Sequence, residues 1–296
     1  MWLINATSLT LSEFYDNDLP EYLILSHTWG ADKDEVTFAE MRTIPRPDAV
    51  KDKSGYRKIV KTCEIALKDD LEYVWIDTCC IDKSSTAELS EAIGSMFRYY
   101  QGAKLCVAYL ADWSGELSEL GSSRWFTRGW TLQELIAPHT LYFYDRGWEC
   151  RGGKFGLAEK VKQVTGISTQ VLRGEKHRDT QPVAVRMSWA ATRKTKRAED
   201  IAYCLLGIFD INMPTLYGEG TKAFLRLQEE IIRQSTDMSI FAWKADERDT
   251  SYTGLLASSP ALFRDLGGLY PQPIQYPARE YHVTNRGIRF EMSLMR

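Results

Sequence analysis

Four short apolar runs, separated by segments with helical spacing, most limit how this chain can fold. The runs cover residues 22–26, 73–76, 105–110 and 141–144. Short runs rich in β-branched and aromatic residues are typical of strands that are buried on both faces. Strands that alternate with helices indicate right-handed crossovers and a parallel sheet with helices on both faces. We therefore predict an open, three-layered α/β unit over about residues 18–150.

The second half of the sequence has a less regular pattern. Its predicted elements are helices at 156–164, 199–209 and 221–235, a strand at 239–243 and a hairpin at 281–292 around Asn285-Arg286-Gly287. The pair Gly152-Gly153 marks the predicted boundary between the two halves. We therefore expect an α/β core over residues 1–150 and a mainly helical extension over 151–296, which ends in a β-hairpin and packs on the core.

Composition and charge exclude several classes of protein. The 37 basic and 40 acidic residues give a net charge of -3, so no global positive field would attract nucleic acid. No apolar run approaches the ~20 residues that cross a bilayer, and the first ten residues lack the pattern of a signal peptide. The six cysteines are too few for a disulfide scaffold, and their spacing fits no zinc site. We expect a cytoplasmic protein with reduced thiols, no membrane span, no nucleic-acid partner and no bound metal.

Polar and aromatic residues follow the predicted strands. Ser26, His27 and Trp29 follow the first strand, and Asp77 follows the second. In open α/β sheets, ligands bind beyond the carboxyl ends of the strands, where the strand order reverses. We therefore expect these four residues to face a helix predicted over residues 124–136 across one cleft.

Glu134 is the most interesting carboxylate of that predicted helix. Thr127, Trp130 and Glu134 are spaced so that one helical face would present them together. A carboxylate beside an indole can have a raised pKa and can lie where a flat ring stacks. The alternative is an exposed Glu134 paired with Arg128, with Trp130 in the core.

Three further sequence patterns have both a functional and a structural interpretation. His27 with Cys79 or Cys80 would form a thiol nucleophile pair, although a structural histidine and buried cysteines explain the same residues. Residues 218–221, Gly-Glu-Gly-Thr, lack the spacing of a phosphate-binding loop and indicate a turn before a helix. The basic run at 193–197 is typical of a solvated surface or a partner contact in an acidic chain.

Three ordered blocks of the sequence resemble the fungal HET (heterokaryon incompatibility) family. They are YLILSHTWG at 22–30 with EVTF at 35–38, VWIDTCCIDK at 74–83 and RWFTRGWTLQEL at 124–135. Residues 197–209 and 213–220 are similar to HET proteins in which this domain precedes nucleotide-binding and repeat modules. The resemblance implies a cell-death effector of fungal self/non-self recognition, an innate-immunity-like function. It also implies self-association and a nucleotide-binding or repeat sensor module in the same or a partner protein.

The same resemblance implies distant kinship to TIR domains, which have a flavodoxin-like fold and whose enzymatic members cleave NAD. Their catalytic glutamate lies in a helix similar to residues 130–135, where this chain has Thr131 in place of the TIR cysteine. The resemblance therefore implies that Glu134 is catalytic and that NAD is a substrate, not a permanently bound cofactor.

The family also implies how a substrate would lie. Breaking the nicotinamide–ribose bond passes through an oxocarbenium-like state, which a nearby carboxylate stabilises. The indoles of Trp29 and Trp130 would stack on a base of the substrate. The other predicted site residues would bind the substrate through polar contacts: Ser26, His27, Asp77 and Arg128. The alternative is a non-enzymatic signalling module of the same fold, which acts by oligomerising, because no complete catalytic signature accompanies Glu134.

Overall fold

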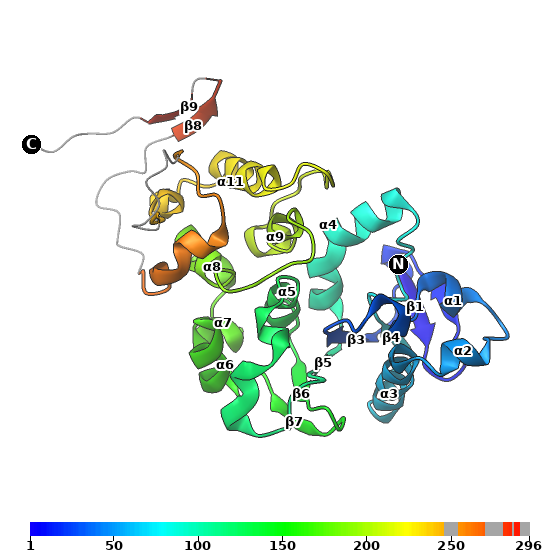
Figure 1. Cartoon of the computed structure of the whole chain (residues 1–296). Coiled ribbons are helices and arrows are strands. Elements are labelled where there is room, and N and C mark those ends of the chain that lie inside the picture. The colour runs from blue at the N-terminus through cyan, green and yellow to red at the C-terminus, as the bar shows by residue number, and fades with distance from the viewer. Residues whose placement is uncertain (246–253, 270–280, 286, 291–296) are drawn as a thin grey trace, which may run out of the picture.

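A seven-stranded sheet forms the core of the first half of the chain (Figure 1). The structure, a computed structural model, describes residues 1–245, 254–269, 281–285 and 287–290. The strand order is β2-β1-β4-β3-β5-β6-β7. Its four central strands run parallel to one another: β3 (Tyr22–His27), β4 (Tyr73–Trp75), β5 (Leu105–Tyr109) and β6 (Leu141–Tyr144). These are the four predicted strands, and in chain order they lie 2-1-3-4, which is the flavodoxin-like arrangement.

Three antiparallel strands that the sequence did not predict extend this sheet at both edges. On one side β1 (Trp2–Asn5) pairs with β4, and β2 (Leu11–Glu13) pairs with β1. On the other side β7 (Cys150–Gly153) pairs with β6, so the sheet includes the glycine pair at which we expected the extension to begin. The sheet is therefore mixed, and only its centre is parallel. The sequences of β2 (LSE) and β7 (CRGG) lack the continuous apolar run that marked the four parallel strands.

Helices cover both faces of the parallel strands. On one face α3 (Ser54–Lys68) packs on β3 and β4, preceded by α1 (Phe38–Arg42) and α2 (Asp48–Lys51). The other face carries α4 (Thr86–Gly102) and α5 (Thr131–Ile136), which contact each other. Right-handed crossovers require this division, because the direction of chain progression reverses after β4. The reversal lies beside β3, and ligands of such sheets bind at the carboxyl ends of the strands near this point.

The second half is mainly helical and packs on the first. Its helices are α6 (Ala158–Thr165), α7 (Thr169–Leu172), α8 (Val183–Ser188), α9 (Asp200–Tyr203), α10 (Leu206–Phe209) and α11 (Lys222–Gln234). In Figure 1, α8, α9 and α11 lie together on the side of α4 and α5. The contact between α10 and α4 depends on Gly207, because a Cβ there would collide with the side chain of Phe97.

The predictions for the second half are confirmed only in part. The hairpin is present as β8 (Tyr281–Thr284) and β9 (Gly287–Phe290), whereas residues 286 and 291–292 of its predicted span lie outside the described residues. The predicted helix at 199–209 is divided into α9 and α10.

The predicted strand at 239–243 is wrong, because residues 238–241 form a 3-10 helix. The Asp237 carboxylate accepts hydrogen bonds from the amides of Ser239 and Val183, and the Ser239 hydroxyl accepts one from the Ala184 amide. This segment therefore caps the start of α8 and does not join a sheet.

Candidate functional site

A cleft of about 400 Å³ opens beside the carboxyl ends of β3 and β4. Six of the seven predicted site residues line it, and the seventh, Ser26, is fully buried and hydrogen-bonded to Glu134. The lining residues come from both halves of the chain: His27, Trp29, Asp32, Asp77, Ile81, Lys83, Leu89, Ile93, Met96, Arg128, Trp130, Thr131, Glu134, Lys196, Arg197, Asp200 and Tyr217. The fold thus brings the predicted residues to one place.

The helix predicted over residues 124–136 is interrupted. Residues 124–127 form a 3-10 turn, and the α-helix begins only at Thr131. Thr127 is exposed and its hydroxyl donates to the carbonyl of Arg124, so it does not share a face with Glu134. The expected Thr127, Trp130 and Glu134 face is therefore wrong, and Thr131 occupies the place beside Glu134 in the cleft.

A segment of the second half causes this interruption. The amide of Lys194 donates to the carbonyl of Thr127 at 2.7 Å, and the amide of Gly129 donates to the carbonyl of Lys194 at 2.9 Å. A side chain at position 129 would meet the Thr195 methyl group at 2.5 Å, so this close approach requires glycine. The backbone of residues 127–129 therefore pairs with residue 194 and does not continue a helix.

Glu134 is buried at the floor of the cleft, with 6% of its surface exposed. Its Oε2 accepts a hydrogen bond from the Ser26 hydroxyl at 2.5 Å, and that hydroxyl accepts one from Trp125 Nε1 at 2.8 Å. Burial raises the pKa of Glu134 to about 8, and the charge of Asp77 adds to the rise, whereas hydrogen bonds with Ser26 and Tyr100 oppose it. A carboxyl group with a pKa near neutrality is suited to take up or release a proton.

The alternative in which Glu134 is exposed and paired with Arg128 is wrong. The second half instead contributes the buried Arg193, whose Nη1 donates to the carbonyl of Arg128 at 2.8 Å and to the Thr131 hydroxyl at 2.9 Å. The expectation that the basic run at 193–197 is a solvated surface therefore fails at its first residue. Arg193 fixes the start of α5, which carries Glu134.

The end of α5 is fixed as well. The buried Lys154 donates through its Nζ to the carbonyls of Leu135 at 3.0 Å and Pro138 at 2.6 Å. Burial lowers the pKa of Lys154 to about 8. A cation beside the last carbonyls of a helix is electrostatically favourable. Both ends of this short helix are thus held, and Glu134 is held with them.

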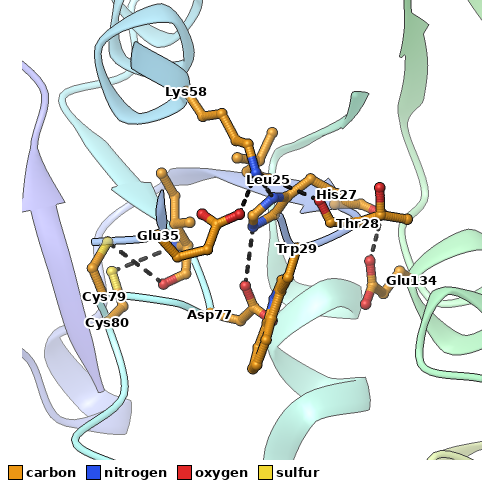
Figure 2. Close-up of polar contacts among 12 residues, drawn as sticks. Leu25, His27, Thr28, Trp29, Glu35, Lys58, Asp77, Cys79, Cys80 and Glu134 are labelled. Atoms are coloured by element: carbon orange, nitrogen blue, oxygen red, sulfur yellow. Dashed lines mark hydrogen bonds and ion pairs between the residues drawn. The ribbon is translucent and has the colours of Figure 1, made fainter. Parts of the chain in front are cut away.

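A polar chain crosses the site from Glu35 to Trp29 (Figure 2). Lys58 Nζ lies 2.5 Å from Glu35 Oε1 and 3.1 Å from His27 Nδ1, and His27 Nε2 lies 3.2 Å from Asp77 Oδ1. Because an ammonium group can only donate, His27 Nδ1 is the acceptor and Nε2–H donates to Asp77. Trp29 Nε1 donates to the other oxygen of Asp77 at 2.8 Å. His27 therefore orients Asp77, and Asp77 orients the indole of Trp29.

Asp77 and Glu134 differ in ionisation although they share the cleft. Burial acts to raise the pKa of Asp77, but hydrogen bonds from His27 and Trp29 and the charge of Lys83 hold it below the ordinary value. Two carboxyl groups whose pKa values are driven apart are the usual basis for a division of acid–base roles. Asp77 is the charged member of this pair, and Glu134 is the member that titrates near neutral pH.

The cysteine–histidine alternative finds no support in this geometry. The Cys80 sulfur accepts a hydrogen bond from the amide of Ile76, and the Cys79 thiol donates to the carbonyl of the same residue. Burial raises the pKa of the Cys80 thiol. Both nitrogens of His27 are engaged elsewhere, by Lys58 and Asp77. The two cysteines are small buried groups beneath the site.

Sequence reasoning missed several residues of the cleft. Lys83 lies in a recognised block but was given no role, and its Nζ lies 3.9 Å from the ring centre of Trp29. Lys196 and Arg197 belong to the basic run. Asp200 accepts a hydrogen bond from the Tyr217 hydroxyl at 2.9 Å and one from Trp130. No local signal in the second half points to a cleft formed mainly by the first half.

Within the described ranges, no group of three or more His, Cys, Asp and Glu side chains is placed to hold a metal ion. In the same part of the chain, no helix has both the length and the apolar character to span a bilayer. All six cysteines are free thiols, and only Cys150 is exposed.

Comparison with known proteins identifies the family of the sheet region. Residues 22–119 match the model of the heterokaryon incompatibility protein (HET) family, and residues 222–261 match a domain of unknown function (DUF8212). The vegetative incompatibility protein HET-E-1 of Podospora anserina is 43% identical over 224 residues, which cover 72% of this chain and 16% of that protein. No solved structure matches the chain. The chain therefore carries a fungal heterokaryon incompatibility (HET) domain.

Proposed function

We propose that this chain acts in heterokaryon incompatibility as a cell-death effector. The match to the HET family and the 43% identity to a vegetative incompatibility protein support this role. The chain spans only 16% of the length of that relative, so the proposal concerns the part of an incompatibility system that this domain performs.

The chemistry that we propose for the domain is hydrolysis of NAD, with Glu134 as the catalytic residue. One observation carries this proposal: Glu134 is a buried carboxyl group with a pKa raised to about 8, at the floor of a cleft that also holds the indoles of Trp29 and Trp130. Perturbed carboxyl groups in clefts are typical of catalytic sites. Indoles offer flat apolar faces on which nicotinamide or adenine stacks.

In the proposed reaction, the bond between the ribose C1′ and the nicotinamide nitrogen breaks, and nicotinamide leaves as a neutral ring with the bonding electron pair. The ribose passes through an oxocarbenium-like state, whose charge the carboxylate of Asp77 and the ionised form of Glu134 stabilise. Water then adds to C1′ and gives its proton to Glu134, whose pKa suits a general base. Ser26 holds Glu134 in position, and His27 holds Asp77.

The test of this proposal is the Glu134→Gln variant, with Glu64→Gln as the matched control. Glu64 lies on the exposed side of α3 and pairs with Lys61. Glutamine keeps the size of Glu134 but can neither ionise nor take up a proton. We expect Glu134→Gln to abolish killing when the chain is expressed, with little change in melting temperature at pH 7, and the control to kill normally. Normal killing by a stably folded Glu134→Gln protein would overturn the catalytic proposal.

We further propose that killing depends on clustering by an attached or partner sensor module, because an unregulated toxin would harm its own cell. A fusion of the chain to an inducible dimeriser tests this step. We expect toxicity to rise with the inducer, and equal toxicity with and without it would contradict the proposal.

The burial of Glu134 also favours a second candidate, a signalling module that oligomerises without turnover. Glu134 has protein partners at its carboxyl group, and both nitrogens of His27 are occupied by protein groups. In that case Glu134→Gln would keep killing intact, and mutation of a contact surface would abolish it.

A further inference from the structure

The cleft contains three cations that form no ion pair with a carboxylate of the described residues. Lys83, Arg128 and Arg197 all line it. Among the described residues, no carboxylate lies within ion-pair distance of any of the three, whereas the neighbouring Lys196 lies 2.8 Å from Asp32. The proposed chemistry at Glu134 does not use these side chains.

Two of these cations rest on aromatic rings. Lys83 Nζ lies 3.9 Å from the ring centre of Trp29, and Arg197 Cζ lies 4.3 Å from that of Tyr217. A cation–π contact at an exposed site contributes much less binding energy than a charge-assisted hydrogen bond to phosphate. Each cation can therefore turn to an anion in the cleft at little cost.

Charge is divided across the cleft. The buried carboxyl groups of Glu134 and Asp200 lie at its floor and wall, whereas Lys83 and Arg197 are exposed at its rim beside the exposed ion pair of Lys196 and Asp32. A ligand that matches this division has a sugar or cationic ring at one end and negative charge beyond it. Trp29 lies between the two regions, since its indole nitrogen donates to Asp77 and its ring contacts the rim cation Lys83.

We propose that Lys83, Arg128 and Arg197 form a phosphate-binding site, which holds the diphosphate of a nucleotide whose ribose lies at Glu134. This inference rests on the proposed function, since it names the part of the substrate that the rim recognises. It assigns a binding role to the basic run of the second half, so the site requires both halves of the chain.

The experiment is a binding titration of the purified chain with ADP-ribose and, in parallel, with nicotinamide riboside, which has no phosphate. The variants are Lys83→Gln with Arg197→Gln, and the control is Lys61→Gln, an exposed lysine on α3. We expect ADP-ribose to bind wild type more tightly than nicotinamide riboside does. The double variant should lose ADP-ribose affinity by about tenfold or more, keep its affinity for the riboside, and lose most of the salt dependence of binding.

The two proposals fail in different ways. Equal binding of both ligands by wild type, unchanged ADP-ribose affinity in the double variant, or no binding of ADP-ribose would overturn the phosphate site. Normal ADP-ribose binding by wild type and Glu134→Gln, without nicotinamide release from NAD by either, would overturn hydrolysis and leave the phosphate site in place. A melting temperature within the range of the control shows that the double variant is folded.

Discussion

The floor and the rim of the cleft are built in opposite ways. At the floor, Ser26 is fully buried and Glu134 is 6% exposed, and hydrogen bonds hold both side chains in one position. At the rim, the side chain of Lys196 is 54% exposed, and Arg197 rests on a ring. A preorganised floor suits bond breaking, because its groups need no rearrangement in the transition state. An adjustable, charged rim suits capture of a ligand.

The largest effect that we expect from the floor is a pH dependence of stability due to Glu134. The folded protein keeps this group protonated up to a pKa of about 8, whereas the unfolded chain releases the proton near 4.5. The folded state therefore binds more protons between these values, and the stability of wild type falls as pH rises through them. Relative to Glu134→Gln, wild type should lose several kcal/mol between pH 5 and 8, since each unit corresponds to ~1.4 kcal/mol.

Urea unfolding of both proteins across this pH range measures the effect. The Glu64→Gln control should follow wild type at every pH. A constant difference between wild type and Glu134→Gln would show that the floor does not perturb the carboxyl group.

The next largest effect should come from Arg193, where the second half supports the floor. Replacement by methionine removes its hydrogen bonds to Arg128 and Thr131 and leaves a buried carbonyl and hydroxyl with fewer partners. We expect a loss of ~2–4 kcal/mol in the free energy of unfolding. A loss below 0.5 kcal/mol in thermal or urea unfolding would show that the two halves are not coupled through this residue.

A smaller effect should show whether the carboxyl groups of Asp77 and Glu134 interact. Asp77→Asn removes the charge that helps to raise the pKa of Glu134. The fall in stability with rising pH should therefore end at a lower pH in this variant, and the total loss should be smaller than in wild type. If Asp77→Asn shows the wild-type pH dependence, the two carboxyl groups do not interact.

The smallest effect should come from the rim. Lys196 and Asp32 form an exposed ion pair, with side chains 54% and 84% exposed, and such pairs contribute little to stability. Lys196→Gln should leave the melting temperature unchanged, in contrast to Arg193→Met three residues earlier. A clear destabilisation would mean that the rim is as much a part of the folded core as the floor.

The difference between floor and rim also explains which parts of the site could be predicted from the sequence. Short apolar runs predicted the four parallel strands, and the rule for the carboxyl ends of strands placed Ser26, His27, Asp77 and Glu134 at one cleft. The rim depends on a segment far away in the chain, and the basic sequence of residues 193–197 is the same for a solvated loop and for a cleft rim. The break in the helix at Gly129 has the same origin, because it requires the backbone of Lys194.

The most direct test of the central claim is nicotinamide release from NAD by purified, artificially clustered protein. We predict release by wild type and by Glu64→Gln, and a rate at least ~10²-fold lower for Glu134→Gln, since the lost carboxylate stabilises the oxocarbenium-like state. No release by clustered wild type that binds ADP-ribose, or equal release by Glu134→Gln, would contradict the claim that Glu134 is the catalytic residue of this cleft.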